Sequence, residues 1–202
     1  DAMPVVPSYD VCATFEPADL TGGDTYDLAL LGERLLVVLG DATGHGIAPA
    51  LSVTQMQAML RMAFRLGADL ETAFLQVNNR LAETLADDRF ITAFIGVLDP
   101  ATHVLRFHSG GQGPIIRYKA ADAKWERYKP TSFPLGAMPL ASLRPALAMD
   151  LEPGDVLAVI SDGIYEFENV HGEPFGEARV QALIAAHADE PTAQMLNHLM
   201  AG

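Results

Sequence analysis

The 202-residue sequence contains one cysteine, Cys12, so it cannot form a disulfide within the chain. No basic residue stands beside Cys12 to activate the thiol, and we expect it to serve as a small apolar side chain of the core. No apolar run approaches the roughly 18 residues of a membrane span, and no signal peptide is recognisable. These absences predict a cytoplasmic protein that has no membrane segment.

Basic residues are also scarce, with 13 Lys and Arg against 26 Asp and Glu and a formal net charge of −13. Such a chain is repelled by nucleic acid and by anionic membrane surfaces, so neither is an expected partner. It also repels phosphorylated substrates, and activity on them would require bound cations that reverse the local field. Half of the residues are hydrophobic, which together with the length predicts one globular domain.

One glycine-rich turn, Gly40-Asp41-Ala42-Thr43-Gly44-His45-Gly46, stands between two predicted elements. The apolar run Leu35–Leu39 before it predicts a buried strand, and the apolar spacing over residues 47–66 predicts a helix. Glycine lets the backbone approach a ligand, and a carboxylate beside a main-chain carbonyl can hold a hard cation. The alternative is a strand-to-helix turn whose Asp or Thr caps the helix. This stretch alone leaves both interpretations open.

Two further acidic turns accompany it, Gly22-Gly23-Asp24-Thr25-Tyr26-Asp27 and Ile160-Ser161-Asp162-Gly163. Each has an Asp next to glycine and beside an apolar run. A hairpin predicted over residues 28–39 would bring Asp24 and Asp41 to the same end of a sheet. The alternative for the earlier turn is ordinary turn chemistry, in which Asp is common.

The remaining pattern predicts strands in hairpins and helices in two pairs. Further strands are predicted at residues 11–15, 90–98, 104–108, 114–118, 124–128, 146–149 and 156–161, and further helices at 69–86, 177–188 and 191–200. In the helix over 69–86 we expect Asp69 to cap the start and Asn78, Asn79 and Arg80 to lie on or near the solvated side. This arrangement predicts an α+β layered fold, without the βαβ alternation of a doubly wound sheet.

The joint order of the acidic turns resembles the SpoIIE/RsbU-type serine/threonine phosphatases, a bacterial branch of the metal-dependent type 2C phosphatase superfamily. Further matching stretches are Asp88-Arg89-Phe90-Ile91-Thr92, Ser109-Gly110-Gly111-Gln112-Gly113-Pro114, Pro134-Leu135-Gly136, Leu151-Glu152-Pro153-Gly154-Asp155 and Glu173-Pro174-Phe175-Gly176. The resemblance covers nearly the whole chain. It implies one phosphatase domain over residues 1–202, built as an α/β/β/α layered sandwich of two antiparallel sheets with helices on the outside.

The resemblance also implies a site that holds two Mn²⁺ or Mg²⁺ ions. It assigns Asp41 as the bridging ligand, Asp24 and the Ala42 carbonyl to one ion, and Asp162 to the other, so that Asp24, Asp41 and Asp162 carry catalysis. Two such cations acidify a water and clamp phosphoryl oxygens. His45 is expected to pack in its turn, with its ring bonded to the main chain, rather than to act as an acid. The remaining histidines show no metal-ligand spacing: His103, His108, His171, His187 and His198.

Two departures from the family pattern bear on this site. Ser109-Gly110-Gly111-Gln112 stands where the family often has Asn-Ala-Gly-His, which weakens any role for a histidine there. The family usually ends with an acidic Asp-Asp-x-Thr strand that supplies a further ligand, whereas this sequence stops at Gly202. We therefore interpret the sequence as a fragment that lacks an upstream regulatory region and this strand; otherwise its metal site is incomplete.

By resemblance the expected substrate is a phosphorylated anti-sigma-factor antagonist of a bacterial partner-switching pathway. An upstream sensory domain is an expected partner, and the resemblance allows a homodimer. The alternative function is a phosphatase-like module with a weakened metal site, which would regulate a partner by binding alone.

Overall fold

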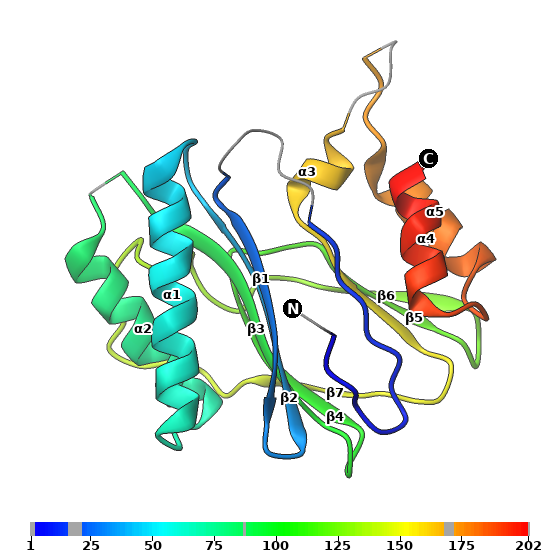
Figure 1. The fold of residues 1–202 in the computed structure, drawn as a ribbon, viewed down its shortest axis with the longest axis horizontal. Coiled ribbons are helices and arrows are strands. Elements are labelled where there is room, and N and C mark those ends of the chain that lie inside the picture. The colour runs from blue at the N-terminus through cyan, green and yellow to red at the C-terminus, as the bar shows by residue number, and fades with distance from the viewer. Residues whose placement is uncertain (1–2, 16–21, 87, 168–171, 202) are drawn as a thin grey trace. The chain divides into compact units, whose positions relative to one another are not determined.

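The computed structural model describes residues 3–15, 22–86, 88–167 and 172–201 (Figure 1). Two compact units make up the chain. The larger unit comprises residues 15–112 and 130–150, and the smaller unit comprises residues 1–14, 113–129 and 151–202. Each unit contains an antiparallel sheet and helices of its own.

The larger unit has a five-stranded sheet with the order β1-β2-β3-β4-β7. Its strands are β1 (Asp24–Leu31), β2 (Arg34–Ala42), β3 (Ile91–Asp99), β4 (Val104–Gly110) and β7 (Leu147–Asp150), and its helices are α1 (Ile47–Arg65) and α2 (Leu70–Thr84). The two helices lie side by side on one face of this sheet (Figure 1). The predicted hairpin is confirmed, because β1 pairs along its whole length with β2 around the turn at Gly32-Glu33.

Alternation along β2 separates the two faces of this sheet. Leu36, Val38 and Ala42 belong to the core that packs against α1 and α2. Because successive side chains of a strand point to opposite faces, Leu35 and Asp41 point away from these helices. A shift of one residue in register would exchange the two sets, so the apolar pattern specifies the register.

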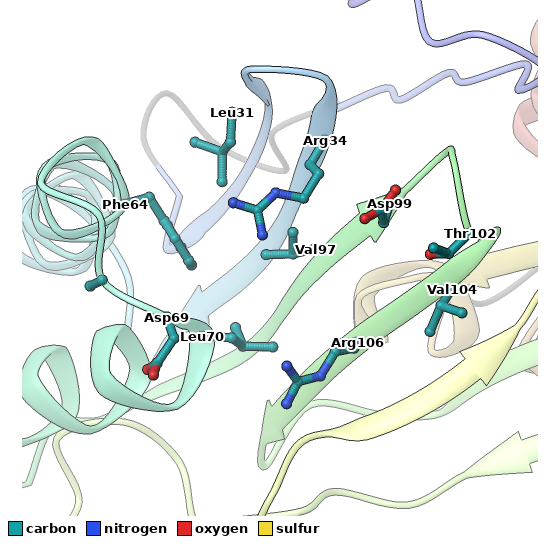
Figure 2. A pocket seen from close by; sticks show the side chains of 11 residues that line it. Leu31, Arg34, Phe64, Asp69, Leu70, Val97, Asp99, Thr102, Val104 and Arg106 are labelled. Carbon is teal, nitrogen blue, oxygen red and sulfur yellow. The ribbon is translucent and has the colours of Figure 1, made fainter.

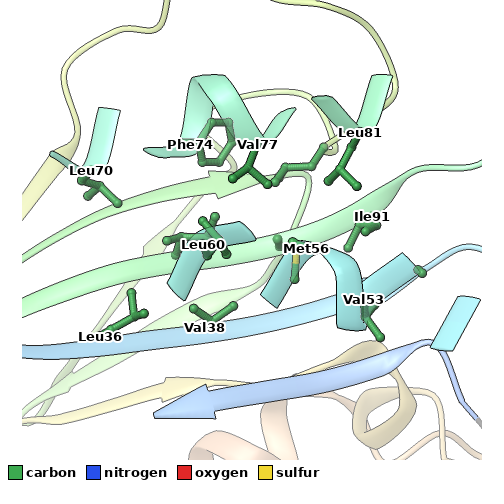
Figure 3. Packing of buried hydrophobic residues seen from close by; sticks show 14 of the residues in the cluster. Leu36, Val38, Val53, Met56, Leu60, Leu70, Phe74, Val77, Leu81 and Ile91 are labelled. Carbon is green, nitrogen blue, oxygen red and sulfur yellow. The ribbon is translucent and has the colours of Figure 1, made fainter. Parts of the chain in front are cut away.

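Helix-facing side chains of the larger unit form one continuous cluster (Figure 3). Helix α1 contributes Val53, Met56 and Leu60, α2 contributes Phe74, Val77 and Leu81, and the strands contribute Leu36, Val38 and Ile91. Burying one such side chain stabilises the fold by about 1.5–3 kcal/mol. Asp69 caps α2 as predicted, because its Oδ1 accepts the Thr72 N–H at 2.7 Å.

Two asparagines of α2 bind the irregular segment that follows β6. Asn78 is only 1% exposed, donates to the Met138 carbonyl at 3.0 Å and accepts the Gly136 N–H at 3.1 Å. Asn79 donates to the Leu140 carbonyl at 2.9 Å. The predicted solvated position was therefore wrong for Asn78. A segment without regular structure needs side-chain partners for its main-chain groups, and this helix supplies them.

The smaller unit has a three-stranded sheet with the order β6-β5-β8. Its strands are β5 (Ile115–Lys119), β6 (Lys124–Tyr128) and β8 (Val156–Val159), and its helices are α3 (Asp162–Tyr165), α4 (Gly176–Ala186) and α5 (Thr192–Ala201). Its core joins the sheet to α4 and α5 through Ile116, Val180, Ile184, Met195 and Leu199. The strand predicted over residues 11–15 is absent, and the last strand ends two residues earlier than predicted.

Two antiparallel sheets with helices confirm the predicted α+β fold. Within the described ranges, none of the helices has both the length and the apolar character that crossing a membrane requires.

Candidate metal site

Asp24 and Asp41 are direct partners across the β1–β2 ladder. Side chains of directly opposed residues lie on the same face of an antiparallel pair, so both carboxylates lie on the face away from α1 and α2. Both residues are half-buried, and the Oδ1 atom of Asp24 is buried. The predicted meeting of these two acids at one end of a sheet is confirmed.

Gly23 leaves room for oxygen atoms beside this pair. A Cβ atom at residue 23 would lie 2.3 Å from the Ala42 carbonyl oxygen and 3.1 Å from the Asp41 Oδ1 atom. The Ala42 N–H donates to the Gly23 carbonyl at 3.0 Å, which holds the two backbones together. Only a residue without a side chain fits this approach.

The chemistry of this donor set is that of a hard-cation site. Two carboxylates and a main-chain carbonyl offer oxygen alone, and oxygen ligands suit Mg²⁺ and Mn²⁺. The cradle at Gly23 keeps a side chain out of the space beside the Asp41 carboxylate and the Ala42 carbonyl. Asp24, Asp41 and Ala42 therefore fit a divalent cation.

Asp27 lies on the other face of the same strand. It is 4% exposed and accepts two hydrogen bonds from Arg61 of α1, at 2.6 Å from Nε and 2.5 Å from Nη2. Bidentate pairing with guanidinium satisfies this carboxylate within the larger unit. Asp27 thus has a structural partner on the helix side of the sheet.

The turn after Asp41 is held by Thr43. Its N–H and hydroxyl both donate to the Phe90 carbonyl, at 3.0 and 3.3 Å, and its oxygen accepts the Phe90 N–H at 3.2 Å. Gly44 and Gly46 have φ values of 95° and 85°, which glycine adopts readily. Gly46 is the N-cap of α1 and neither Asp41 nor Thr43 caps it, so the capping interpretation is wrong.

His45 is exposed, and no hydrogen bond of its ring is found among the described residues. The predicted packing of this ring against the main chain is therefore wrong. The turn is stabilised by Thr43 and by its glycines instead.

Sequence reasoning missed two polar residues near this end of the sheet. Thr92 lies opposite Asp41 on β3, and its hydroxyl contacts the Asp41 carbonyl at 3.4 Å and donates to Gln112 Oε1 at 3.1 Å. Gln112 is 4% exposed and occupies the position where the family often has histidine. Both belong to stretches that carried the family resemblance, which was the available signal.

Asp162 belongs to the smaller unit and is exposed. It is the first residue of α3 rather than the end of a strand, because β8 stops at Val159. The role of Asp162 as a ligand stays a prediction.

Asp155, in another of the matching stretches, has a structural partner. Its carboxylate contacts Arg117 and accepts the N–H groups of Glu152 at 3.0 Å and Ala120 at 3.1 Å. Burial raises the pKa of Asp155, but these hydrogen bonds outweigh it and leave the pKa below its usual value. This carboxylate stabilises the smaller unit.

A pocket of about 410 Å³ lies at the other end of the five-stranded sheet (Figure 2). It is lined by Leu31, Arg34, Phe64, Ala68, Asp69, Leu70, Val97, Asp99, Thr102, Val104 and Arg106. Seven residue steps of β2 separate Arg34 from Asp41, roughly 23 Å of strand. None of the predicted site residues lines this pocket.

Comparison with known proteins supports the family resemblance. The family model described as "Stage II sporulation protein E (SpoIIE)" matches residues 32–202. The chain belongs to the SpoIIE family. The predicted resemblance to SpoIIE/RsbU-type phosphatases is thus confirmed.

Two curated relatives align with nearly the whole chain. Protein IcfG of Synechocystis sp. is 25% identical over 95% of this chain and 34% of its own length. Phosphoserine phosphatase RsbU of Bacillus subtilis is 22% identical over 98% of this chain and 58% of its own length. The chain therefore spans about a third of one relative and somewhat over half of the other.

Solved structures show the same fold. The RsbU and RsbW domains of Rv1364c from Mycobacterium tuberculosis match with a TM-score of 0.77 and 26% identity, over 91% of this chain and 51% of that one. RsbX in complex with magnesium matches with a TM-score of 0.69 and 16% identity, over 91% of this chain and 81% of that one.

Proposed function

We propose that this chain is a metal-dependent protein serine/threonine phosphatase. The observation that carries the proposal is the Asp24–Asp41 pair beside the Gly23 cradle, on the face of the sheet away from α1 and α2. Membership of the SpoIIE family and the similarity to phosphoserine phosphatase RsbU support it. A divalent cation bound there would acidify a water and neutralise phosphoryl charge, which hydrolysis of a phosphate monoester requires.

The chain's own residues would hold and orient these cations, which we expect to be two Mn²⁺ or Mg²⁺ ions. Asp41 would bridge, and Asp24 and the Ala42 carbonyl would complete one coordination shell. Thr92 would position the Asp41 backbone through its contact with the Asp41 carbonyl, and Gln112 would orient the Thr92 hydroxyl by accepting its hydrogen bond. The family resemblance makes Asp162 the expected ligand of the second ion.

The net charge of −13 gives the cations a second role. An acidic surface repels a phosphoprotein, and bound divalent ions reverse the field locally. We infer that bound metal is needed for substrate affinity and not only for turnover. The proposed substrate class is a phosphoserine or phosphothreonine protein of the anti-sigma-factor antagonist type, and the similarity to RsbU supports this class.

The test is phosphate release from a phosphoserine protein in the presence of Mn²⁺, with the Asp41→Asn variant beside the parent protein. Loss of the bridging ligand removes several kcal/mol of transition-state stabilisation, so we expect turnover to fall on the order of 10³-fold. Asp150→Asn, an exposed change at the end of β7, is the matched control and should keep full activity. Near-normal turnover of Asp41→Asn, with metal present, would refute the assignment.

A further inference from the structure

A second group of potential metal ligands lies in the smaller unit, at the corner between α4 and α5. It comprises His187, Glu190 and His198, whose ligand atoms all lie within 4.8 Å of one another. Among the described residues, no other group of three His, Cys, Asp or Glu side chains meets this spacing. The sequence predicted no metal-ligand spacing for these histidines, because ten residues separate them along the chain.

The fold closes that separation through a tight turn. His187 caps α4, and its N–H donates to the Leu183 and Ile184 carbonyls at 3.1 and 3.3 Å. The Glu190 N–H donates to the His187 carbonyl at 3.0 Å, which reverses the chain. His198 lies seven residues, two helical turns, beyond Pro191, so it returns to the side of α5 where the turn lies. Figure 1 shows α4 and α5 packed together at this end of the chain.

Buried residues hold the two helices in place. Val180 and Ile184 of α4 and Met195 and Leu199 of α5 share one core cluster. Leu199 directly follows His198, so the backbone that carries this histidine is anchored by core packing. The three side chains themselves are 24%, 38% and 46% exposed for His187, Glu190 and His198, which leaves the group accessible from solvent.

Two distances within this group are close to those between ligands of one small cation. His187 Nδ1 lies 2.9 Å from Glu190 Oε1, and His198 Nε2 lies 3.2 Å from Glu190 Oε2. With bonds of about 2.0–2.1 Å, the ligand atoms of a tetrahedral zinc ion lie roughly 3.3 Å apart. The two imidazole rings are stacked, with centroids 3.8 Å apart and planes at 14°. Because a metal ion lies near the plane of each imidazole that binds it, one ring must rotate for both histidines to bind the same ion.

We propose that His187, Glu190 and His198 form a Zn²⁺ site with three protein ligands and an open fourth position. Two imidazoles and one carboxylate are a donor set that suits zinc, whereas the oxygen-only set at Asp24 and Asp41 suits Mg²⁺ or Mn²⁺. The site is chemically separate from the proposed phosphatase centre, and the inference does not depend on that function. A bound ion would join the end of α4 to α5 and stabilise the helix pair.

Proton positions change when the ion binds. Each ring nitrogen that faces Glu190 donates a hydrogen bond to it in the metal-free protein. For binding, each neutral imidazole places its single proton on its other nitrogen, and no net proton is released. A charged imidazole must lose one proton to solvent before its nitrogen can bind the ion.

The glutamate is ready to bind at neutral pH. Hydrogen bonding from His187, together with the nearby imidazoles, lowers the pKa of Glu190, and so it remains a carboxylate. The alternative to a metal site is a plain hydrogen-bonded cluster in which two histidines share one acceptor.

Calorimetry with ZnCl₂ on the chelator-treated 202-residue chain tests the proposal. The Asp41→Asn background excludes zinc bound at the acidic turns. We expect one Zn²⁺ per chain and a higher unfolding temperature with zinc, because an ion that binds only the folded state stabilises it by mass action. His198→Gln and Glu190→Gln should each weaken zinc binding at least tenfold. Because glutamine is a good helix former, α5 should persist in His198→Gln.

His103→Asn is the matched control, since it removes an exposed histidine of the larger unit, and asparagine tolerates its φ of 58°. It should leave zinc affinity unchanged. No saturable zinc binding in the Asp41→Asn background would overturn the proposal. Equal zinc affinity of His198→Gln, Glu190→Gln and their parent would overturn it as well.

Discussion

Acidic side chains have different surroundings on the two faces of the β1–β2 hairpin. On the helix face, Asp27 is almost fully buried and meets the guanidinium of Arg61. On the other face, Asp24 and Asp41 lie directly opposite each other. Like charges opposed across a ladder are destabilising by up to about 1 kcal/mol, whereas opposite charges stabilise.

This difference separates structural acids from candidate ligands. An acid that serves the fold has a cation or several N–H groups of the chain around it, as Asp27 and Asp155 do. A carboxylate that binds a metal is held near another carboxylate. Their repulsion lowers the stability of the fold until the cation binds. Asp27 is an acid of the first kind, and we propose that Asp24, three residues before it on the same strand, is of the second.

The largest effect should follow from filling the cradle on the acidic face. In Gly23→Ala the new Cβ would lie 2.3 Å from the Ala42 carbonyl oxygen, so the backbone must move. Misplacing ligands by about 1 Å can lower catalysis on the order of 100-fold, and we expect a comparable loss of Mn²⁺-dependent phosphate release. Gly32→Asn, at the open turn of the same hairpin, is the control and should retain activity. Full activity of Gly23→Ala would show that this close approach is irrelevant to the site.

A smaller effect, on stability alone, should follow from breaking the pair on the helix face. Asp27→Asn removes the charge that Arg61 binds at 2.5–2.6 Å. Because Arg61 is half exposed and can be hydrated, we expect a loss of only about 1–2 kcal/mol in the free energy of unfolding. Urea unfolding of Asp27→Asn, Arg61→Met and the double variant would measure the coupling. A coupling free energy near zero would mean that the Asp27–Arg61 pair does not stabilise the fold.

The smallest effect concerns the pH dependence of the helix face, where His108 packs against Phe74. Burial lowers the pKa of His108; the charge of Glu71 acts in the opposite direction, and that of Arg106 lowers it further. The unfolded chain takes up this proton near pH 6.5 and the folded chain only at lower pH. Stability should therefore fall as the pH drops below 6.5, by at most about 1.4 kcal/mol per pH unit.

Urea unfolding between pH 7.5 and 5 measures this slope. His108→Gln should reduce it whatever its effect on absolute stability. An unchanged slope in this variant would assign the acid sensitivity to other groups.

Short-range patterns predicted much of the larger unit. The apolar stripe of Phe74, Val77 and Leu81 marked α2, and the hairpin around Gly32-Glu33 placed Asp24 opposite Asp41. These features depend on periodicity and on a short turn, and both can be recognised in the sequence without knowledge of distant contacts.

Features that depend on distant partners were missed. The helical pattern predicted a solvated position for Asn78, whose hydrogen-bond partner Gly136 is distant in the sequence. The strand predicted over residues 11–15 is absent, because apolar, branched residues favour a strand only where a neighbour pairs with them. His187 and His198 meet only through the α4–α5 turn.

Thermal unfolding of the parent protein, Asp24→Asn and Asp27→Asn, in chelator and then in millimolar Mn²⁺, would show whether the Asp24–Asp41 face of the hairpin binds a cation. We expect changes of opposite sign in chelator: Asp24→Asn raises the unfolding temperature because it relieves charge repulsion, and Asp27→Asn lowers it. Mn²⁺ should raise the unfolding temperature of the parent protein and Asp27→Asn by similar amounts, and that of Asp24→Asn by clearly less. An equal Mn²⁺ shift in all three proteins would contradict the claim that the acidic face of the hairpin holds the cation.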